Sequence, residues 1–331
     1  MKKVLLLGGA GFIGFNITKF LSFNREYDIT VADNFFRGKM DDVFLEHIQK
    51  FNIKVVNADF TDMKSFSLLE NDYDYVYFLA AVVGVKYTEE IPNELIRINT
   101  FLTINTLEWL KESKCKKVLF TSTSECYAGT IESFGYTVPT DEEVPLSIND
   151  ITNPRFTYAV TKMLGESGFY HYSRIFGFDC TIVRYHNVYG PRMGFKHVIP
   201  QVVQRFLQNE DPFLIYGYNQ TRSFNYIDDA VNGTVLAMEM DNTSGQIFHI
   251  GDMRDEIKIE TLVRFIGKTM GYNGLYENVP APDGSVSRRC PDISKATRIL
   301  GYEPLASWQA GVKNTVTWYK EYIEAGGNVF E

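Results

Sequence analysis

The sequence predicts a doubly wound α/β fold, in which helices cover both faces of a parallel β-sheet, followed by a smaller, mainly helical lobe. Through the first half of the 331-residue chain, short apolar runs alternate with segments of helical periodicity. Such alternation is typical of parallel sheets, because a right-handed crossover through a helix joins one strand to the next. After about residue 180 the pattern becomes mainly helical. We therefore expect a sheet domain over residues 1–180 and a lobe over residues 181–331, with segments that cross back to the first domain.

The apolar runs and the periodic segments place the individual elements along the chain. The expected strands are Lys3–Leu7, Asp28–Ala32, Lys54–Val56, Tyr75–Ala80, Lys117–Thr121 and Cys180–Tyr185. The helices expected between them are Phe12–Phe23, Asp41–Lys50, Met63–Glu70, Asn93–Lys111 and Phe156–Phe176. Residues 128–154 are rich in Gly, Pro, Thr, Glu and Asp and predict a long loop. The lobe is expected to contain the helices Val198–Leu207, Asp229–Met238, Ile259–Met270, Ile293–Leu300 and Trp308–Tyr322.

The composition of the chain indicates a globular protein and disfavours nucleic-acid and membrane partners. Apolar residues make up 45% of the chain and charged residues 22%, which is ordinary for a globular protein with a full core. The net charge of −8 disfavours nucleic acid as a partner. An anionic substrate would therefore need arginines placed locally around it. No apolar stretch is long enough to span a membrane, so we expect no membrane partner.

The first residues and the cysteines predict a cytoplasmic protein without a metal. Two lysines precede a short apolar run that Gly8 to Gly11 interrupt, which fits a buried strand better than a signal peptide. The four cysteines, at positions 115, 126, 180 and 290, have no C-x-x-C spacing. A zinc site or a disulfide framework is therefore not expected.

A glycine motif at the start of the chain predicts a dinucleotide site. Gly8, Gly11 and Gly14 have the spacing G-x-x-G-x-x-G, and Gly9 with the last two also satisfies G-x-G-x-x-G. The motif lies between a predicted strand and a predicted helix, which is the context that it requires. Glycine permits a tight turn and a close approach of the backbone to a diphosphate. The free N–H groups and the dipole at the start of the next helix attract the same anion.

Asp33 indicates which dinucleotide is bound. It ends the second predicted strand, where a carboxylate would hold the hydroxyls of the adenosine ribose. The same carboxylate would repel the additional phosphate of NADP, so NAD is expected. Arg37 is the counter-argument, since a nearby arginine can pair with that phosphate. Asp59 can accept a hydrogen bond from the adenine amine, or simply cap a turn.

Tyr158 and Lys162 are candidates for hydride chemistry. They are four residues apart on a predicted helix and so share one face. An ammonium and an oxidised nicotinamide nearby would favour the phenolate, which could take a hydroxyl proton while hydride leaves the same carbon. Chance alone produces about one such pair in a chain this rich in tyrosine and lysine. The position of the pair, after the fifth strand of a dinucleotide-binding pattern, gives it its weight.

The strand that ends at Thr121 is followed by Ser-Thr-Ser-Glu-Cys-Tyr at residues 122–127. Ligands of open parallel sheets bind at the carboxyl ends of the strands. The hydroxyl of Thr123 could donate to the oxygen being oxidised, and Glu125 could act as a general base or acid on neighbouring carbons. Polar residues that merely cap a strand are the alternative interpretation.

These motifs together resemble the extended short-chain dehydrogenase/reductase family of nucleotide-sugar enzymes. The resemblance covers nearly the whole chain and rests on six segments. They are GGAGFIG at 8–14, TSTSECY at 121–127, YAVTK at 158–162, RYHNVYGPRM at 184–193, TRSFNYIDDA at 221–230 and RRCPDISKATRILGYEP at 288–304. The resemblance implies a Rossmann-type sheet that binds NAD over residues 1–180 and a substrate lobe over residues 181–331. It also implies a homodimer, formed through the helices Asn93–Lys111 and Phe156–Phe176.

The resemblance also assigns roles to residues. Hydride would pass from C4 of the sugar to NAD and leave a 4-keto intermediate, with Tyr158 as the base and Lys162 on the nicotinamide ribose. The catalytic set would be Thr123, Ser124, Glu125, Tyr158 and Lys162. The NAD site would comprise Gly8, Gly11, Phe12, Ile13, Gly14, Asp33, Asn34, Asp59, Phe60, Leu79, Ala80, Ala81, Tyr158, Lys162, Tyr185 and Val188. The substrate site would comprise Val85, Lys86, Glu125, Asn187, Arg192, Arg222 and Arg289.

Within that substrate site, Asn187 and Arg222 are similar to residues that hold the phosphates of the sugar nucleotide. Arg289 is similar to an arginine that binds a phosphate or a carboxylate. His186 can meet the nicotinamide or the substrate, or be a structural histidine.

The reaction itself stays open between several alternatives. The triplet at residues 123–125 resembles those of UDP-glucuronate decarboxylases and GDP-mannose 4,6-dehydratases, and simple 4-epimerases usually lack its glutamate. Glucose 4,6-dehydratases carry Asp where Ser124 stands. The segments at 184 and 221 are also similar to those of GDP-mannose 3,5-epimerase. We expect an epimerase or dehydratase that oxidises the sugar transiently at C4. The alternatives are a nucleotide-uronate decarboxylase, a net dehydrogenase or reductase, and a non-catalytic dinucleotide sensor.

Overall fold

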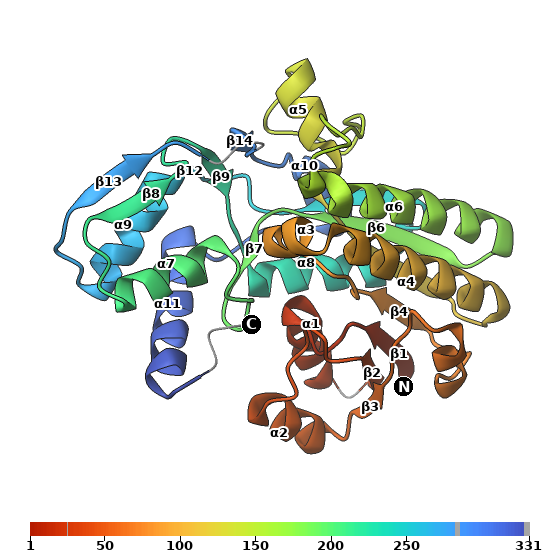
Figure 1. The fold of residues 1–331 in the computed structure, drawn as a ribbon. Helices are drawn as coiled ribbons and strands as arrows, with labels where there is room; N and C mark the ends of the chain where they lie inside the picture. The colour runs from red at the N-terminus through yellow and green to blue at the C-terminus, as the bar shows by residue number, and fades with distance from the viewer. Residues whose placement is uncertain (25, 282–284, 328–331) are drawn as a thin grey trace.

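A seven-stranded parallel sheet forms the centre of the computed structural model, which describes residues 1–24, 26–281 and 285–327 (Figure 1). Its strand order is β11-β6-β5-β4-β1-β2-β3, and each neighbouring pair is parallel. The strands are β1 (Lys2–Leu7), β2 (Tyr27–Asp33), β3 (Lys54–Asn57), β4 (Tyr75–Phe78), β5 (Lys117–Thr123), β6 (Asp179–Tyr185) and β11 (Gln246–Ile250). The predicted doubly wound α/β fold is confirmed.

Helices cover both faces of this sheet because its strands are apolar on both sides. In β1, Val4 and Leu6 point to one apolar cluster, and Leu5 and Leu7 point to the other, as the alternation of a strand requires. The first face carries α1 (Phe12–Ser22), α2 (Asp42–Phe51), α8 (Ile227–Glu239) and α10 (Ser294–Leu300). The second face carries α4 (Pro92–Glu112), α6 (Thr157–Phe176) and the 3₁₀-helix η1 (Met63–Leu68).

The lobe, at the left of Figure 1, has its own apolar core beneath three helices. They are α7 (Val198–Leu207), α9 (Ile259–Met270) and α11 (Trp308–Glu324). Small sheets complete it: β8 (Phe213–Tyr216) with β13 (Tyr276–Val279), and β12 (Glu256–Lys258) with β9 (Thr221–Ser223) and β14 (Arg288–Arg289). A further pair, β7 (Val188–Tyr189) with β10 (Asn225–Tyr226), lies where the chain passes between lobe and sheet. The segments that return to the sheet are α8, β11 and α10, and the division into two domains at residue 180 stays a prediction.

The structure differs from the predicted elements in four places. Part of the predicted loop over 128–154 is helical, as α5 (Ala128–Phe134), and ends at Gly135 with φ of 62°. Residues 85–90 form a short helix, α3 (Val85–Glu90), and η1 has 3₁₀ geometry. Strand β11 was not predicted, because five residues without polar alternation carry little signal until they pair with β6.

Within the described ranges, no helix is both long and apolar enough to cross a membrane. The cytoplasmic location of the protein stays a prediction.

The turn after β1 requires glycine for steric reasons. Gly8 has φ of +84°, and a Cβ there would lie 2.6 Å from the backbone nitrogen of Ala80 on the neighbouring chain segment. A Cβ on Gly14 would lie 2.3 Å from the carbonyl oxygen of Gly8. Gly11 differs, since its Cβ would approach only that same oxygen, at 3.4 Å. The first and last glycines therefore bring α1 close to the sheet, and the middle one faces open space.

Gly14→Ala should lower the stability of the protein because its Cβ would overlap backbone rather than a movable side chain. We expect a loss of about 1–3 kcal/mol, seen as a lower Tm in thermal unfolding. Gly11→Ala is the matched control and should leave the Tm nearly unchanged. Equal Tm values for the two variants would show that the turn is less tightly packed than described.

Candidate active site

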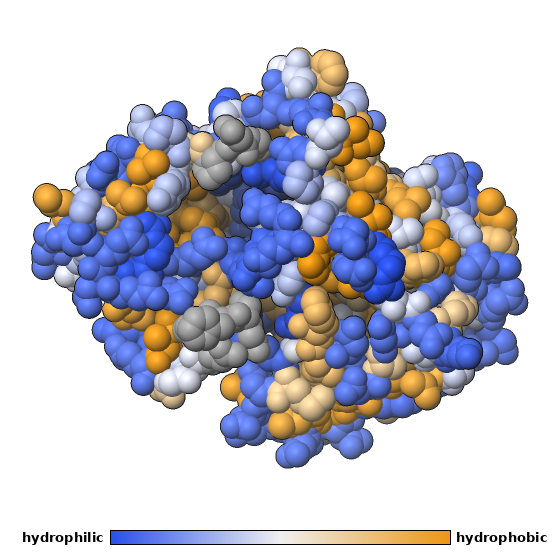
Figure 2. All heavy atoms as spheres, in the orientation of Figure 1, coloured by the Kyte–Doolittle hydropathy of each residue, from blue (hydrophilic) through white to orange (hydrophobic). Residues whose placement is uncertain are grey.

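A cavity of about 690 Å³ opens at the carboxyl ends of β1, β4 and β5 and reaches the lobe. Its walls run from the glycine turn at residues 8–14 to Arg289 of β14. In an open α/β sheet, the crevice where the strand order reverses is the place where ligands bind. Figure 2 shows mainly hydrophilic residues around the hollow where the lobe meets the sheet domain. The size of the cavity suits a small-molecule site.

One end of the cavity fits a dinucleotide. Asp33 is buried there, and its carboxylate accepts hydrogen bonds from the backbone nitrogens of Ala10, at 3.0 Å, and Phe35, at 2.8 Å. Burial raises the pKa of Asp33, and these N–H groups oppose the shift. Because Gly11 lacks a side chain, a diphosphate can approach the start of α1. Every residue expected in the NAD site lines this cavity.

Asp59 lines the same end of the cavity, but its carboxylate also accepts a hydrogen bond from the nitrogen of Thr61 at 2.9 Å. It therefore shapes a turn, and its role toward adenine stays a prediction.

Tyr158 and Lys162 lie on the first turns of α6 and both line the cavity. The Lys162 ammonium donates to the carbonyl oxygen of Thr121 at 2.7 Å and lies over the ring of Phe120 at 4.8 Å. Burial lowers the pKa of Lys162 to about 8. Such a buried ammonium is poorly compensated by one carbonyl and would gain from the hydroxyls of a ribose.

The tyrosine differs from the expectation in one respect. Burial raises the pKa of Tyr158, and the cation that lowers it is Arg37 rather than Lys162. Lys162 lies 5.8 Å from the centre of the Tyr158 ring.

The residues after β5 form a short 3₁₀-helix, η2 (Ser124–Tyr127), that turns their side chains toward the cavity. Thr123 caps this helix, since its hydroxyl oxygen accepts from the backbone nitrogen of Glu125 at 3.2 Å. The capping interpretation and the catalytic one are thus compatible, because Thr123, Ser124 and Glu125 all line the cavity. Ser124 is buried beside them.

Glu125 forms an ion pair with Arg289 of β14, with 2.6 Å between Oε1 and Nη1. Burial disfavours the charge of Glu125, but Arg289, helped by Arg155 and Arg222, holds its pKa at about 2. The second guanidinium nitrogen of Arg289, Nη2, is buried and has no hydrogen-bond partner. The pair therefore carries an ionised carboxylate and an arginine with unused donor capacity.

Of the other residues expected in the substrate site, Asn187 and Arg192 line the cavity and Arg222 does not. Asn187 lines the cavity and donates to the carbonyl oxygen of Ser223 at 2.8 Å. Arg192 also lines it, but forms an ion pair with Asp41 at 2.5 Å. Arg222 does not line it, and its guanidinium donates to carbonyl oxygens, among them that of Thr221 at 2.8 Å.

One of the two residues of α3 that were expected in the substrate site lies outside the cavity lining. Lys86 is exposed, pairs with Glu90 at 3.5 Å and does not line the cavity. Val85 begins α3, and its side chain lies outside the described part of the structure.

Several residues of the cavity were missed in the sequence. Arg155 lies in η3 (Pro154–Phe156), three residues before Tyr158, and its Nε is buried without a partner. Arg155 directly precedes the helix that carries Tyr158 and Lys162, and this position in the sequence could have identified it as a residue of the cavity. Arg37, Tyr87 and Lys196 line the opposite wall, and only the folded chain brings them together.

His186 has a structural position. It is fully buried, its Nε2 lies 2.8 Å from the hydroxyl of Tyr127, and it is absent from the cavity lining.

The comparisons with known proteins show the family of this chain. The family model described as the NAD dependent epimerase/dehydratase family matches residues 4–251. The chain belongs to the NAD-dependent epimerase/dehydratase family. The predicted extended short-chain dehydrogenase/reductase membership, the NAD cofactor and the enzyme class are thereby confirmed.

Relatives in this family align along nearly the whole chain. A UDP-N-acetyl-α-D-glucosaminuronate decarboxylase of Bacillus cytotoxicus is 35% identical over 97% of this chain and 98% of its own. A UDP-glucuronate 4-epimerase of Thermodesulfobacterium geofontis is 31% identical over 98% of each chain. The crystal structure of UDP-glucuronic acid 4-epimerase from Bacillus cereus, with UDP-glucuronic acid and NAD, superposes with a TM-score of 0.82. Its sequence identity is 27%, covering 96% of this chain and 99% of that one.

Among the described residues, no group of three or more His, Cys, Asp or Glu side chains is placed to hold a metal ion.

Tyr158→Phe should reduce turnover by about 10²- to 10⁴-fold, because it removes a proton acceptor and donor without altering the shape of the site. Binding of NAD, measured by calorimetry, should be retained. Tyr73→Phe is the control, since the Tyr73 hydroxyl is buried without a partner and remote from this cavity. Undiminished turnover in Tyr158→Phe would contradict the assigned role.

Proposed function

We propose that this enzyme decarboxylates a UDP-linked uronic acid through transient oxidation of the sugar at C4. The observation that carries the proposal is the Glu125–Arg289 ion pair in the same cavity as Tyr158. The resemblance of its Thr-Ser-Glu triplet to that of UDP-glucuronate decarboxylases supports it, as does the 35% identity to the Bacillus cytotoxicus decarboxylase.

The charges around Glu125 favour an anionic sugar. Three arginines, Arg155, Arg222 and Arg289, influence one carboxylate, so the region carries an excess of positive charge. Arg289 and Arg155 each have a buried nitrogen without a partner. A uronate carboxylate would provide the missing acceptor, since a guanidinium binds two oxygens at once.

The chemistry then follows from the positions of the side chains. NAD, when bound, supplies the acceptor that takes hydride from C4 and later returns it. Tyr158 takes the proton of the C4 hydroxyl, and the hydroxyl of Thr123 is available to hold that oxygen. With a carbonyl at C4, the C5–C6 bond can break, because its electron pair passes into the C4–C5 enolate as CO₂ leaves. C5 must then receive a proton.

Glu125 is suited to that protonation once substrate is present. Arg289 keeps it ionised, with its pKa at about 2. A uronate carboxylate that binds Arg289 removes part of this stabilisation, so the pKa of Glu125 rises and the carboxyl group can carry a proton.

The direct test uses UDP-glucuronate and UDP-N-acetylglucosaminuronate labelled with ¹³C at C6. We expect labelled CO₂ and a UDP-pentose product by NMR, with no net change in NADH absorbance. A product that keeps C6 and is inverted at C4 would make the enzyme a 4-epimerase instead. Net accumulation of NADH would make it a dehydrogenase, and turnover of neutral sugars alone would contradict the uronate proposal.

Glu125→Gln should separate oxidation from protonation. We expect steady-state formation of the UDP-pentose to fall about 10²-fold or more, because C5 no longer receives its proton, whereas oxidation at C4 persists as transient NADH in a single turnover. Glu143→Gln, an exposed change in the loop after α5, is the control. Undiminished formation of the UDP-pentose by Glu125→Gln would exclude this role.

We further propose that the chain forms a homodimer through α4 and α6. These helices pack side by side on the sheet (Figure 1), yet they keep large apolar side chains exposed. The exposed side chains are Ile96, Phe101 and Ile104 of α4 and Val160 and Leu164 of α6. Their spacing of three to five residues gathers them along one face of each helix. Two such faces would bury one another in a four-helix bundle.

Phe101→Glu combined with Leu164→Glu should convert the dimer to a monomer, because it places charges in an apolar interface. Light scattering after size exclusion measures the mass. Leu305→Glu, at an exposed loop position outside this face, is the control and should remain dimeric. A wild-type protein of monomeric mass would overturn the dimer proposal.

A further inference from the structure

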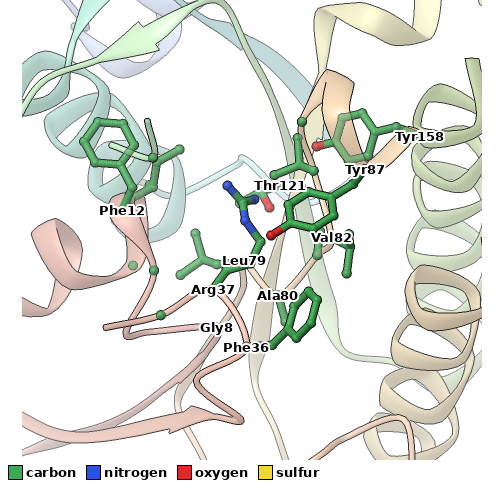
Figure 3. Close-up of a pocket in the computed structure, with 18 of the residues that line it drawn as sticks. Gly8, Phe12, Phe36, Arg37, Leu79, Ala80, Val82, Tyr87, Thr121 and Tyr158 are labelled. Atoms are coloured by element: carbon green, nitrogen blue, oxygen red, sulfur yellow. The ribbon is translucent and has the colours of Figure 1, made fainter. Parts of the chain in front are cut away.

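Arg37 lies inside the cavity although neither the motifs nor the proposed reaction use it. It follows Asp33 in the loop after β2, and this loop packs on the glycine turn. The backbone nitrogen of Lys39 donates to the carbonyl oxygen of Ala10 at 3.3 Å, and a Cβ on Gly38 would lie 2.7 Å from that of Ala10. Figure 3 shows the Arg37 side chain leaving this loop for the middle of the cavity, toward Tyr87 and Tyr158.

The guanidinium of Arg37 has an aromatic neighbour but no anion. In the described part of the chain it forms no hydrogen bond and no ion pair, and burial lowers its pKa. Its Cζ lies 5.9 Å from the centre of the Tyr87 ring, and Tyr158 is the other group that raises its pKa. A half-buried arginine without a counter-charge is costly, so an anionic ligand at this place would stabilise it.

Tyr87 connects three segments that are far apart in the sequence. It belongs to α3. The guanidinium of Arg37, from the loop after β2, lies over its ring. The Nζ of Lys196, from the segment before α7, lies 4.1 Å from the ring centre. Phe36 packs against it with 6.0 Å between the ring centres. Cations over an aromatic face attract the ring quadrupole, more strongly when water is excluded. Tyr87 thus holds the Arg37 side chain over the interior of the cavity.

We propose that Arg37 binds the diphosphate of NAD and that Tyr87 holds it there, which retains the cofactor between turnovers. Arg37 starts beside the turn whose N–H groups face a diphosphate, and its planar fork matches two phosphate oxygens. An enzyme that returns hydride to the same sugar requires its cofactor to stay bound. The proposal rests on the NAD dependence of the family and not on decarboxylation.

The direction of Arg37 argues against a role in NADP binding. The additional phosphate of NADP would lie on the ribose that faces Asp33, whose carboxylate is buried against Ala10. The guanidinium of Arg37 instead points toward Tyr158, at the catalytic end (Figure 3). The arginine that suggested NADP in the sequence therefore serves the other part of the dinucleotide.

Binding measurements on cofactor-free protein test this directly. Arg37→Ala should weaken NAD and ADP-ribose, which share the diphosphate, by about tenfold or more, and should leave UDP unchanged. Arg37→Lys should recover part of the loss. Tyr87→Leu should weaken the same two ligands less, and Tyr87→Phe, which keeps the ring, should match wild type. The dissociation rate of NAD should rise in the same order.

Arg264→Ala, which removes an exposed arginine of the lobe paired with Glu260, is the matched control. Arg37→Gln, of similar length, replaces Arg37→Ala should the latter not fold by circular dichroism. Unchanged constants for NAD and ADP-ribose would overturn the proposal. A loss confined to NADP would assign Arg37 to the ribose phosphate, and a loss confined to UDP would assign it to the substrate. A failure of decarboxylation would not affect these constants.

Discussion

The ion pair between Glu125 and Arg289 joins the two parts of the molecule. Glu125 follows the central strand β5, and Arg289 arrives on β14 from the lobe. The segment beyond Arg289 is fixed to the sheet domain by two backbone hydrogen bonds, from Thr140 to Cys290 at 2.9 Å and from Asp292 to Thr140 at 2.7 Å. Removing two charges from water is expensive, and a mainly buried pair is weak evidence for stability. Its place in a ligand cavity, with a donor still unused, indicates that the pair is kept for binding and catalysis.

Two further cations in the cavity also have few partners within the protein. Lys162 is buried with one carbonyl partner, and Arg37 is half-buried with an aromatic neighbour and no anion among the described residues. Both cations therefore stand in an environment that a ligand with phosphates and ribose hydroxyls would complete. Binding of cofactor and substrate would supply anionic and polar partners to these side chains.

Local patterns in the sequence predicted six of the seven strands of the central sheet and the residues that line the cofactor end of the cavity. The glycine turn and Asp33 are recognised by spacing, and Tyr158 with Lys162 by helical periodicity, because in each case the requirement lies within one or two adjacent elements. The sequence did not predict β11, whose identity as a strand depends on pairing with β6. It also did not reveal the meeting of Tyr87 with Lys196, since more than a hundred residues separate them. Arg222 was placed in the substrate site by resemblance, whereas its guanidinium is taken up by carbonyl oxygens near β14.

Helix α6 lines the cavity with one face and exposes apolar side chains on the opposite face. Tyr158 and Lys162 face the cavity, and Val160 and Leu164, interleaved with them, face outward with about two fifths of each side chain exposed. In the proposed dimer, the partner subunit would press on the same two turns that hold the reacting phenol. Subunit association would then steady the geometry of the chemistry, and a mutation at the subunit contact would be felt as a change in rate before any loss of fold. In such a dimer, a single stretch of chain would serve both subunit contact and activity.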